Sequence, residues 1–164
     1  MRSANPLRTR LRLQLGAIPR ACREIMKRPV VCICSGQTVQ QAAQLMRDRE
    51  LGFVPVCDEH GLVIGVLTDR DVATRVGATG ERAGDTVVAT VMTRNVVACR
   101  PTDRLSRAMA LMRQHRLTRV LCTDSLGRAV GVLSLSDIAQ YERPATIGRT
   151  LQTVALRKYA PERP

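Results

Sequence analysis

Two short strings in the chain combine a hydroxyl residue with a carboxylate at the same spacing. The first string is GVLTDRD and the second, 66 residues later, is GVLSLSD. In each, Thr68 or Ser134 stands at the expected end of a strand, and Asp71 or Asp137 lies one turn into the following helix. A hydroxyl beside the free N–H groups of a helix start suits a phosphate, and a carboxylate can accept from two neighbouring ribose hydroxyls. The spacing therefore fits a ribonucleotide, and it fits a plain helix cap equally well.

The two strings belong to an internal repeat. Residues 25–73 align with residues 91–139 at a constant offset of 66 and without a gap. Two copies at this period are too few for a solenoid, so the repeat predicts a pseudo-symmetric pair of small units. Each copy has about 50 residues, which is marginal for an independent core, and we expect the copies to fold against each other. Two equivalent units would form two equivalent clefts where they meet.

Hydrophobic periodicity and turn residues predict the same element order in both copies. In the first copy we expect a strand at 30–33, a helix from Thr38 to 50, strands at 53–57 and 62–67 around a turn at 58–61, and a helix from Thr68 to about 76. The second copy predicts strands at 96–99, 119–123 and 128–133 and helices at 103–116 and 136–142. Short helices are expected at 21–27 and, capped by Thr86, at 87–92. The expected fold class is α/β (α+β), with tandem βαββα units related by pseudo-twofold symmetry.

Charge and composition divide the chain into five expected segments. These are a basic, disordered arm (1–20), a first unit (21–76), a linker (77–87), a second unit (88–142) and a C-terminal tail (143–164). The net charge of +12 is concentrated at the ends, since the arm alone holds five arginines and no acid. An alternative role for the arm is electrostatic contact with nucleic acid or anionic lipid. Nucleic-acid binding by the repeat itself is not expected, because an aromatic content of 2% offers few rings for base stacking.

The six cysteines are predicted to be free thiols in a reducing cytoplasm. They lack the CxxC spacing of common metal and redox sites. Cys99 and Cys122 align with Ile33 and Val56 in the repeat, which favours packing as small hydrophobes. The less favoured alternative is a metal or redox site built on Cys32, Cys34 and His60. No run of about 18 apolar residues is present, so no membrane span is predicted, and no secretory signal is expected.

The duplicated pattern of Met26, Pro55-Val56, Asp58 and Gly61 with the two strings resembles a pair of CBS (cystathionine β-synthase) domains, the Bateman module. The resemblance covers about residues 21–142. It is similar to small stand-alone bacterial two-CBS proteins of the hypoxic-response type, which share the TDRD string. The resemblance implies βαββα units, two adenosyl-ligand sites between the copies, and dimerisation of modules into a disc.

The resemblance also implies roles for individual residues. Thr68 and Asp71 match the phosphate and ribose positions of one site, and Ser134 and Asp137 match those of the other. The base pockets are matched by Val31, Cys32, Phe53 and Pro55 in the first copy and by Val97 and Ala98 in the second. The second copy departs from the family pattern at two places. Leu121-Cys122 stands where the family usually has Pro-Val. Arg119, which is placed to reach a phosphate, stands where the first copy has Phe53. We therefore expect the first site to bind more tightly and the second to be weaker or empty.

These features predict a non-catalytic regulatory module. It would bind AMP, ADP, ATP or an S-adenosyl compound in clefts between its two CBS units and report the energy or stress state, with no obligatory cofactor. The alternative is a structural or interaction module with degenerate sites, whose Arg-rich ends dock a protein or nucleic-acid partner. An enzyme is least favoured, because neither His60 nor His115 stands near a convincing nucleophile or second base.

We also expect a homodimer, formed by helices 38–50 and 103–116. Beyond the residues that each helix needs for its own core, the sequence leaves a second apolar strip, which a lone module would expose. The strip consists of Ala43, Met46, Ala108, Met109 and Met112.

Overall fold

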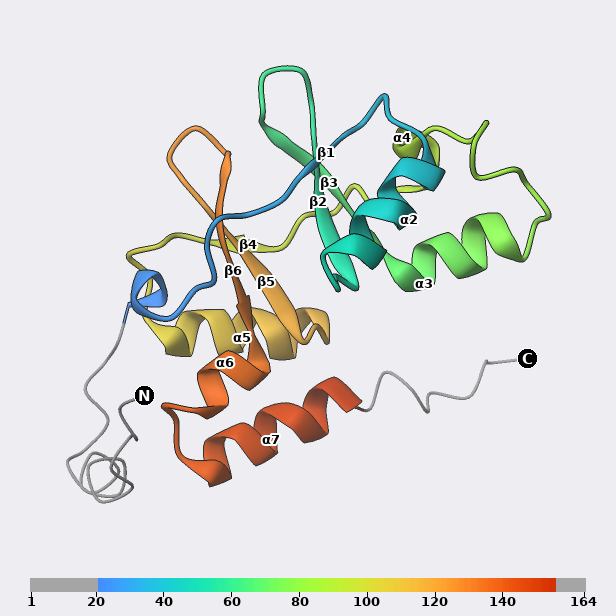
Figure 1. Ribbon diagram of the computed structural model, residues 1–164. Coiled ribbons are helices and arrows are strands. Elements are labelled where there is room, and N and C mark those ends of the chain that lie inside the picture. Colours follow the sequence, from blue (N-terminus) through green and yellow to red (C-terminus); the bar gives the residue numbers. More distant parts are fainter. Residues whose placement is uncertain (1–20, 156–164) are drawn as a thin grey trace, which may run out of the picture. The chain divides into compact units, whose positions relative to one another are not determined.

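The computed structural model describes residues 21–155 and divides the chain into two compact units (Figure 1). We name each unit by its long central helix. The α2 unit contains residues 28–97 and 123–130, and the α5 unit contains residues 21–27, 98–122 and 131–155. The basic arm expected at 1–20 and the last residues of the expected tail, 156–164, lie outside the described residues.

The α2 unit is built on a three-stranded sheet in the order β1-β2-β3. Its strands are β1 (Ile33–Cys34), β2 (Phe53–Cys57) and β3 (Val63–Thr68), with β1 parallel and β3 antiparallel to β2. Its helices are α2 (Val39–Asp48), α3 (Asp69–Asp71) with its continuation η2 (Val72–Gly77), and α4 (Val88–Val91). Thr38 caps α2 by accepting from the Gln41 backbone N–H, as predicted. Gly61 turns the β2–β3 hairpin at a φ of 77°, which glycine adopts without strain.

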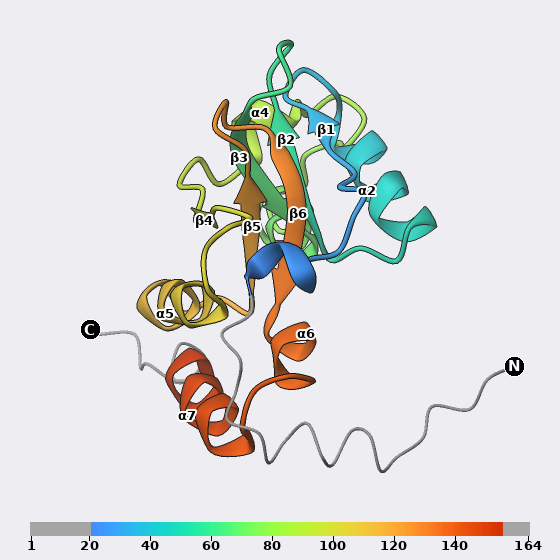
Figure 2. The same cartoon turned by 90° about the vertical axis from the view of Figure 1, so that its left-hand side faces the viewer.

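The α5 unit repeats this plan and adds one helix. A second sheet has the order β4-β5-β6, with β4 (Ala98–Cys99) parallel to β5 (Arg119–Thr123) and β6 (Ala129–Ser134) beyond it. Its helices are η1 (Cys22–Glu24), α5 (Leu105–His115), α6 (Leu135–Ala139) and α7 (Pro144–Ala155). The added helix, α7, packs against α5 and α6 (Figure 2). Arg113 of α5 donates to the Thr150 hydroxyl of α7 at 3.1 Å, and Ile147, Thr150 and Val154 are buried.

The predicted order β-α-β-β-α is confirmed in both copies, and so is the mixed α/β class. The compact units, however, do not follow the contiguous copies. Met26 precedes the first copy's sheet but packs against Gly131 of β6, and Met92 precedes the second copy's sheet but packs against Gly65 of β3. Backbone hydrogen bonds extend the same exchange, from Lys27 N–H to the Val132 carbonyl at 2.9 Å and from Thr93 N–H to the Val66 carbonyl at 2.8 Å. Each sheet is therefore completed by the first residues of the other copy.

Several predicted elements have different bounds in the structure. The helix expected at 21–27 is reduced to η1, because the Lys27 backbone is extended and pairs with Val132. The strand expected at 30–33 is reduced to Ile33–Cys34, the two residues that pair with β2. Thr86 does not cap α4, because its hydroxyl donates to the Arg82 carbonyl at 3.0 Å and α4 begins after Val87. The predicted tail contains the 12-residue helix α7, for which the sequence offered only weak periodicity.

The apolar strip predicted to be exposed is instead largely buried within the chain. Met46, Met109 and Met112 are 6%, 4% and 0% exposed, and Ala108 is fully buried. Met109 lies one turn before Arg113, the residue of α5 that bonds to α7, so the added helix lies beside this part of the strip. The prediction that a lone module exposes this apolar strip is therefore wrong. A homodimer remains a prediction that rests on the family resemblance.

Candidate ligand-binding site

The hydroxyl and carboxylate of the first string hold each other in a reciprocal cap. Thr68 ends β3, and its Oγ1 accepts from the Asp71 N–H at 3.1 Å. In return, Asp71 Oδ2 accepts from Thr68 Oγ1 at 2.7 Å and from the Thr68 N–H at 3.0 Å. This capping box satisfies otherwise free backbone donors and fixes both side chains at the junction of β3 and α3. The helix-cap function of the string is thus present in the structure.

The other oxygen of the Asp71 carboxylate, Oδ1, forms an ion pair with Arg75. Arg75 Nη2 lies 3.2 Å from Asp71 Oδ1, one helical turn further along the chain. The same guanidinium donates to the Val91 carbonyl at 2.6 Å and to the Thr93 hydroxyl at 3.1 Å. Arg75 therefore connects Asp71 to the segment that completes the β3 side of the sheet.

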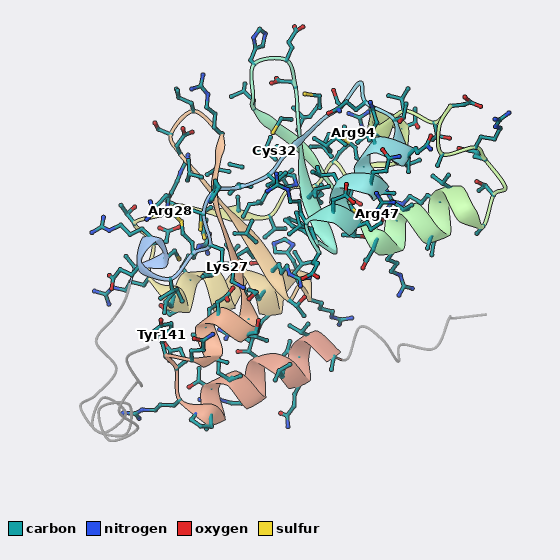
Figure 3. All side chains as sticks on the ribbon, viewed as in Figure 1. Lys27, Arg28, Cys32, Arg47, Arg94 and Tyr141 are labelled. Atoms are coloured by element: carbon teal, nitrogen blue, oxygen red, sulfur yellow. The ribbon has the colours of Figure 1, made fainter. Side chains whose placement is uncertain are left out.

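The second string has the same geometry with a different cation. Asp137 Oδ2 accepts from the Ser134 N–H at 3.1 Å and from the Ser134 hydroxyl, and the Asp137 N–H donates to Ser134 Oγ at 3.1 Å. Lys27 Nζ lies 3.1 Å from Asp137 Oδ1. Figure 3 shows Lys27 beside α6, on the segment that follows η1. The carboxylate is 10% exposed and the lysine side chain 75% exposed, so the ammonium can leave the carboxylate at little cost.

The ionisation of Asp137 contributes to the stability of the folded state. Burial is the largest single influence and raises the pKa of Asp137, but hydrogen bonds from Ser134 and Lys27 together lower it below the ordinary value of 3.8. Since the folded-state pKa is depressed, ionised Asp137 contributes stability that is complete above the ordinary value and is lost as pH falls through the folded-state pKa.

Asp137→Asn is therefore expected to lower the free energy of unfolding at neutral pH, and the difference from wild type should shrink below about pH 4. Urea unfolding at a series of pH values measures this. Lys27→Met is the companion variant, and it should reduce the same pH dependence because it removes one of the groups that lower the pKa. A difference between wild type and Asp137→Asn that stays constant down to the most acidic pH would contradict the assignment.

A cavity of about 390 Å³ adjoins the second string. Ser134, Ser136 and Arg119 are among the polar residues that line it. Leu135 and Ala139 of α6 and Ile147 and Leu151 of α7 supply the apolar part, with Thr118 completing the set. All eight residues belong to the α5 unit. The cavity can therefore hold an anionic group beside an apolar or aromatic one.

The structure brings some of the other predicted site residues close to the two strings and places the rest elsewhere in the sheets. Phe53 begins β2 and pairs directly with Thr68 in the sheet, so these two residues are adjacent. Pro55 is buried opposite Val66. Val31 and Cys32 come just before β1, and β2 stands between β1 and β3 in the sheet order. In the second copy, Arg119 begins β5 and lines the same cavity as Ser134, Val97 immediately precedes β4, and Ala98 pairs with Leu121.

The two cations, Arg75 and Lys27, were not among the predicted site residues. Arg75 follows Asp71 by four residues, so the i,i+4 rule for helix pairs could have found it. Tyr141 occupies the corresponding position in the second copy, so the repeat gave no support for such a pair. Lys27 had no local signal, because it reaches Asp137 only through the exchanged segment.

The described residues also bear on the predictions about thiols, metal binding and membrane spans. Cys99 and Cys122 are buried as predicted. Cys22 and Cys57 are also buried, Cys32 is half-buried and Cys34 is exposed. Within residues 21–155, no group of three or more His, Cys, Asp or Glu side chains is arranged to hold a metal ion. Over the same range, no helix is long and apolar enough to cross a membrane.

Comparison with known proteins identifies the family. Residues 22–78 and 88–143 each match the family model described as "CBS domain". The chain belongs to the CBS-domain family. It is 38% identical over 117 residues to the CBS domain-containing protein YhcV of Bacillus subtilis, covering 71% of this chain and 81% of the relative. The predicted resemblance and the expected tandem CBS fold are thereby confirmed.

Two further proteins are similar to this CBS-domain chain. Hypoxic response protein 1 of Mycobacterium tuberculosis is 28% identical and is covered to 82% of its length. A crystal structure of Hypoxic Response Protein I, described with two coordinated zinc ions, matches with a TM-score of 0.68 at 27% identity, covering 76% of this chain and 100% of that one. The CBS domain pair of protein MJ0100, in complex with 5′-methylthioadenosine and S-adenosyl-L-methionine, shares the fold with a TM-score of 0.68 at 22% identity, covering 75% and 95%. The chain spans only 24% of the length of an inosine-5′-monophosphate dehydrogenase from Methanocaldococcus jannaschii, which it also matches.

Proposed function

We propose that this CBS-domain protein is a non-catalytic regulatory module that binds adenosine compounds at Thr68/Asp71 and at Ser134/Asp137. The observation that carries the proposal is the identical construction of the two pairs. In each, a hydroxyl at the end of a strand is locked to a carboxylate three residues later, and a cation stands at the second carboxylate oxygen. A helix cap needs the reciprocal hydrogen bonds, but it does not need the cation.

The geometry limits how a ribose would bind. A carboxylate has about four lone-pair directions. Oδ2 of Asp71 already accepts two hydrogen bonds from Thr68, and Oδ1 forms an ion pair with Arg75. Oδ1 therefore offers one direction to a ribose hydroxyl, and a second hydroxyl would displace the cation. Lys27 at the second site is the easier of the two cations to displace, since its side chain is 75% exposed and Arg75 is held by two further hydrogen bonds.

The cavity beside Ser134 suits the rest of such a ligand. Arg119 and the two serine hydroxyls are suited to a phosphate or a carboxylate, and charge-assisted hydrogen bonds of this kind are among the stronger ones in proteins. The leucines and Ile147 present an apolar surface to a base or an alkyl group. This cavity argues against an empty second site. The relative affinity of the two sites stays a prediction.

A fold shared with the MJ0100 pair supports the ligand class, because that protein was crystallised with two adenosyl compounds. The alternative function is an interaction module whose Arg-rich ends dock a protein or nucleic-acid partner. A cytoplasmic location and a homodimer belong to the proposal as well. Light scattering that shows a monomer with and without nucleotide would remove the dimer.

Thermal unfolding with a panel of ligands tests the proposal directly. The panel is AMP, ADP, ATP, S-adenosylmethionine and methylthioadenosine, with GTP as the matched control. A ligand that binds only the folded chain stabilises it by about 2.7 kcal/mol at a hundred times its Kd, so at least one adenosine compound should raise the melting temperature by several degrees. No shift with any adenosine compound at millimolar concentration would favour the interaction module instead.

A further inference from the structure

Three buried cysteines from three separate segments meet in the α5 unit. Cys22 lies in η1, Cys99 in β4 and Cys122 in β5. The Sγ atoms of Cys99 and Cys122 are 3.5 Å apart, and those of Cys99 and Cys22 are 3.8 Å apart. Cys99 and Cys122 are also direct partners in the parallel β4–β5 pair, so their backbones are one strand spacing apart. Cys99 is thus in contact with two other thiols.

The repeat supplies an internal comparison for this cluster. At the offset of 66, Cys22 corresponds to Val88, Cys99 to Ile33 and Cys122 to Val56. The three aliphatic residues are all buried in the core of the α2 unit. The fold therefore needs only apolar side chains at these positions, and the second copy has a thiol at each of them. Packing explains why the three side chains are buried, but it does not explain why all three are thiols.

We propose that Cys22, Cys99 and Cys122 form a redox modification site, in which a hydroperoxide converts two of the three thiols into a disulfide centred on Cys99. The Cys99 thiolate attacks one peroxide oxygen, the O–O bond breaks, and hydroxide leaves and becomes water by taking up the thiol proton. The resulting sulfenic acid is attacked by the sulfur of Cys22 or Cys122, the S–O bond breaks, and a second water leaves. In sum, two thiols and one hydrogen peroxide give one disulfide and two waters.

The surroundings of Cys99 favour it as the reacting thiol. Side-chain hydrogen bonds with Cys122 and Cys22 lower the pKa of Cys99, although burial opposes this. In contrast, the neighbouring thiols and burial raise the pKa of Cys122. Strand separation is also suitable, since disulfides join Cα atoms about 4.4–6.8 Å apart and neighbouring strands lie about 4.7–4.9 Å apart.

Access to Cys99 depends on the segment that carries η1. Cys99 is 5% exposed. The three-residue η1 is held by hydrogen bonds from Cys22 N–H to the Asp103 carbonyl at 2.7 Å and from Arg23 N–H to the Pro101 carbonyl at 2.8 Å. Short elements of this kind open locally at a lower free energy than the whole fold. Oxidation of Cys99 should therefore be slower than that of the exposed Cys34.

A Cys22–Cys99 disulfide would also act on the second ligand site, a consequence that rests on the proposed function. Five residues after Cys22, Lys27 pairs with Asp137 and its backbone pairs with Val132. A covalent bond at Cys22 would hold this segment in place and keep the ammonium beside the carboxylate. Oxidation should thus change ligand affinity at Ser134/Asp137 and leave Thr68/Asp71 unaffected.

Peptide mapping of the oxidised protein tests the modification site. The reduced Cys34→Ser chain, which lacks the exposed thiol, is treated with hydrogen peroxide, denatured with an alkylating reagent and digested without reductant. We expect most Cys99 to be recovered in a disulfide with Cys22 or Cys122, and dithiothreitol to reverse it. Recovery of all three cysteines as alkylated free thiols, or a Cys22–Cys122 disulfide that excludes Cys99, would overturn the proposal.

The first copy provides the matched control. The Cys34→Ser chain that also carries Cys22→Val, Cys99→Ile and Cys122→Val has the first copy's residues at the cluster, and it should fold with a melting temperature unaffected by peroxide. The single variant Cys22→Val separates the formation of a disulfide from its proposed effect on ligand affinity. It should still form Cys99–Cys122 but lose any redox effect on ligand affinity. If no adenosine compound binds at all, the proposed function fails while the peptide map still decides the disulfide.

Discussion

Asp71→Ala is expected to weaken the binding of an adenosine compound at the first site by about ten- to a hundredfold. The change removes the only carboxylate of the Thr68/Asp71 pair, and hydrogen bonds to a charged group are each worth about 1.5–3 kcal/mol. Isothermal calorimetry with the ligand that gives the largest thermal shift measures the effect. The fold should survive, because the loss of one helix cap costs about 1 kcal/mol and the Arg75 ion pair is partly exposed.

The repeat provides the control for this variant. Asp137→Ala makes the same change at the second site and should reduce affinity at the tighter site much less. If the second site proves to be the tighter one, the two variants exchange their effects, and the predicted ranking of the sites is wrong while the ligand class stands. Unchanged binding in both variants would mean that the two strings serve only as helix caps.

Leu133→Ala is expected to lower the free energy of unfolding by about 2–5 kcal/mol, the usual cost of deleting a buried leucine side chain. Leu133 is fully buried in β6 and directly precedes Ser134, so it supports both the core and the second site. Guanidinium unfolding followed by far-UV circular dichroism measures the loss. Since domains of this size are stable by roughly 5–15 kcal/mol, this loss would be a large fraction of the total stability.

Two variants make this measurement specific. Leu67→Ala changes the corresponding residue of β3, which is also fully buried, and should cost a similar amount. Leu126→Ala changes a residue that is 63% exposed in the β5–β6 turn and should alter stability by less than about 0.5 kcal/mol. A loss below about 1 kcal/mol for Leu133→Ala would contradict the burial assigned to β6.

Local sequence signals were sufficient for the repeat, its element order and its caps. Strands 53–57 and 119–123 have the predicted bounds, because each is a short apolar run followed by a turn with a glycine at positive φ. Thr68 and Ser134 cap their helices through residues only three positions away. The offset of 66 and the family resemblance placed both hydroxyl–carboxylate pairs at strand ends. The cap and turn signals depend on neighbours within a few residues, and the repeat shows them twice.

Only the tertiary structure decided what surrounds these pairs. Lys27 reaches Asp137, and Cys22 reaches Cys99, because residues 21–27 belong to the same compact unit as Cys99 and Asp137. Helix α7 was not predicted as a functional element, because its role depends on packing against α5 and α6. The sequence alone determined the repeat, the caps and the position of the strings, since local periodicity and hydrogen bonding specify them. The partners of those strings were decided by long-range packing, which satisfies backbone groups and apolar faces across segments that share no local pattern.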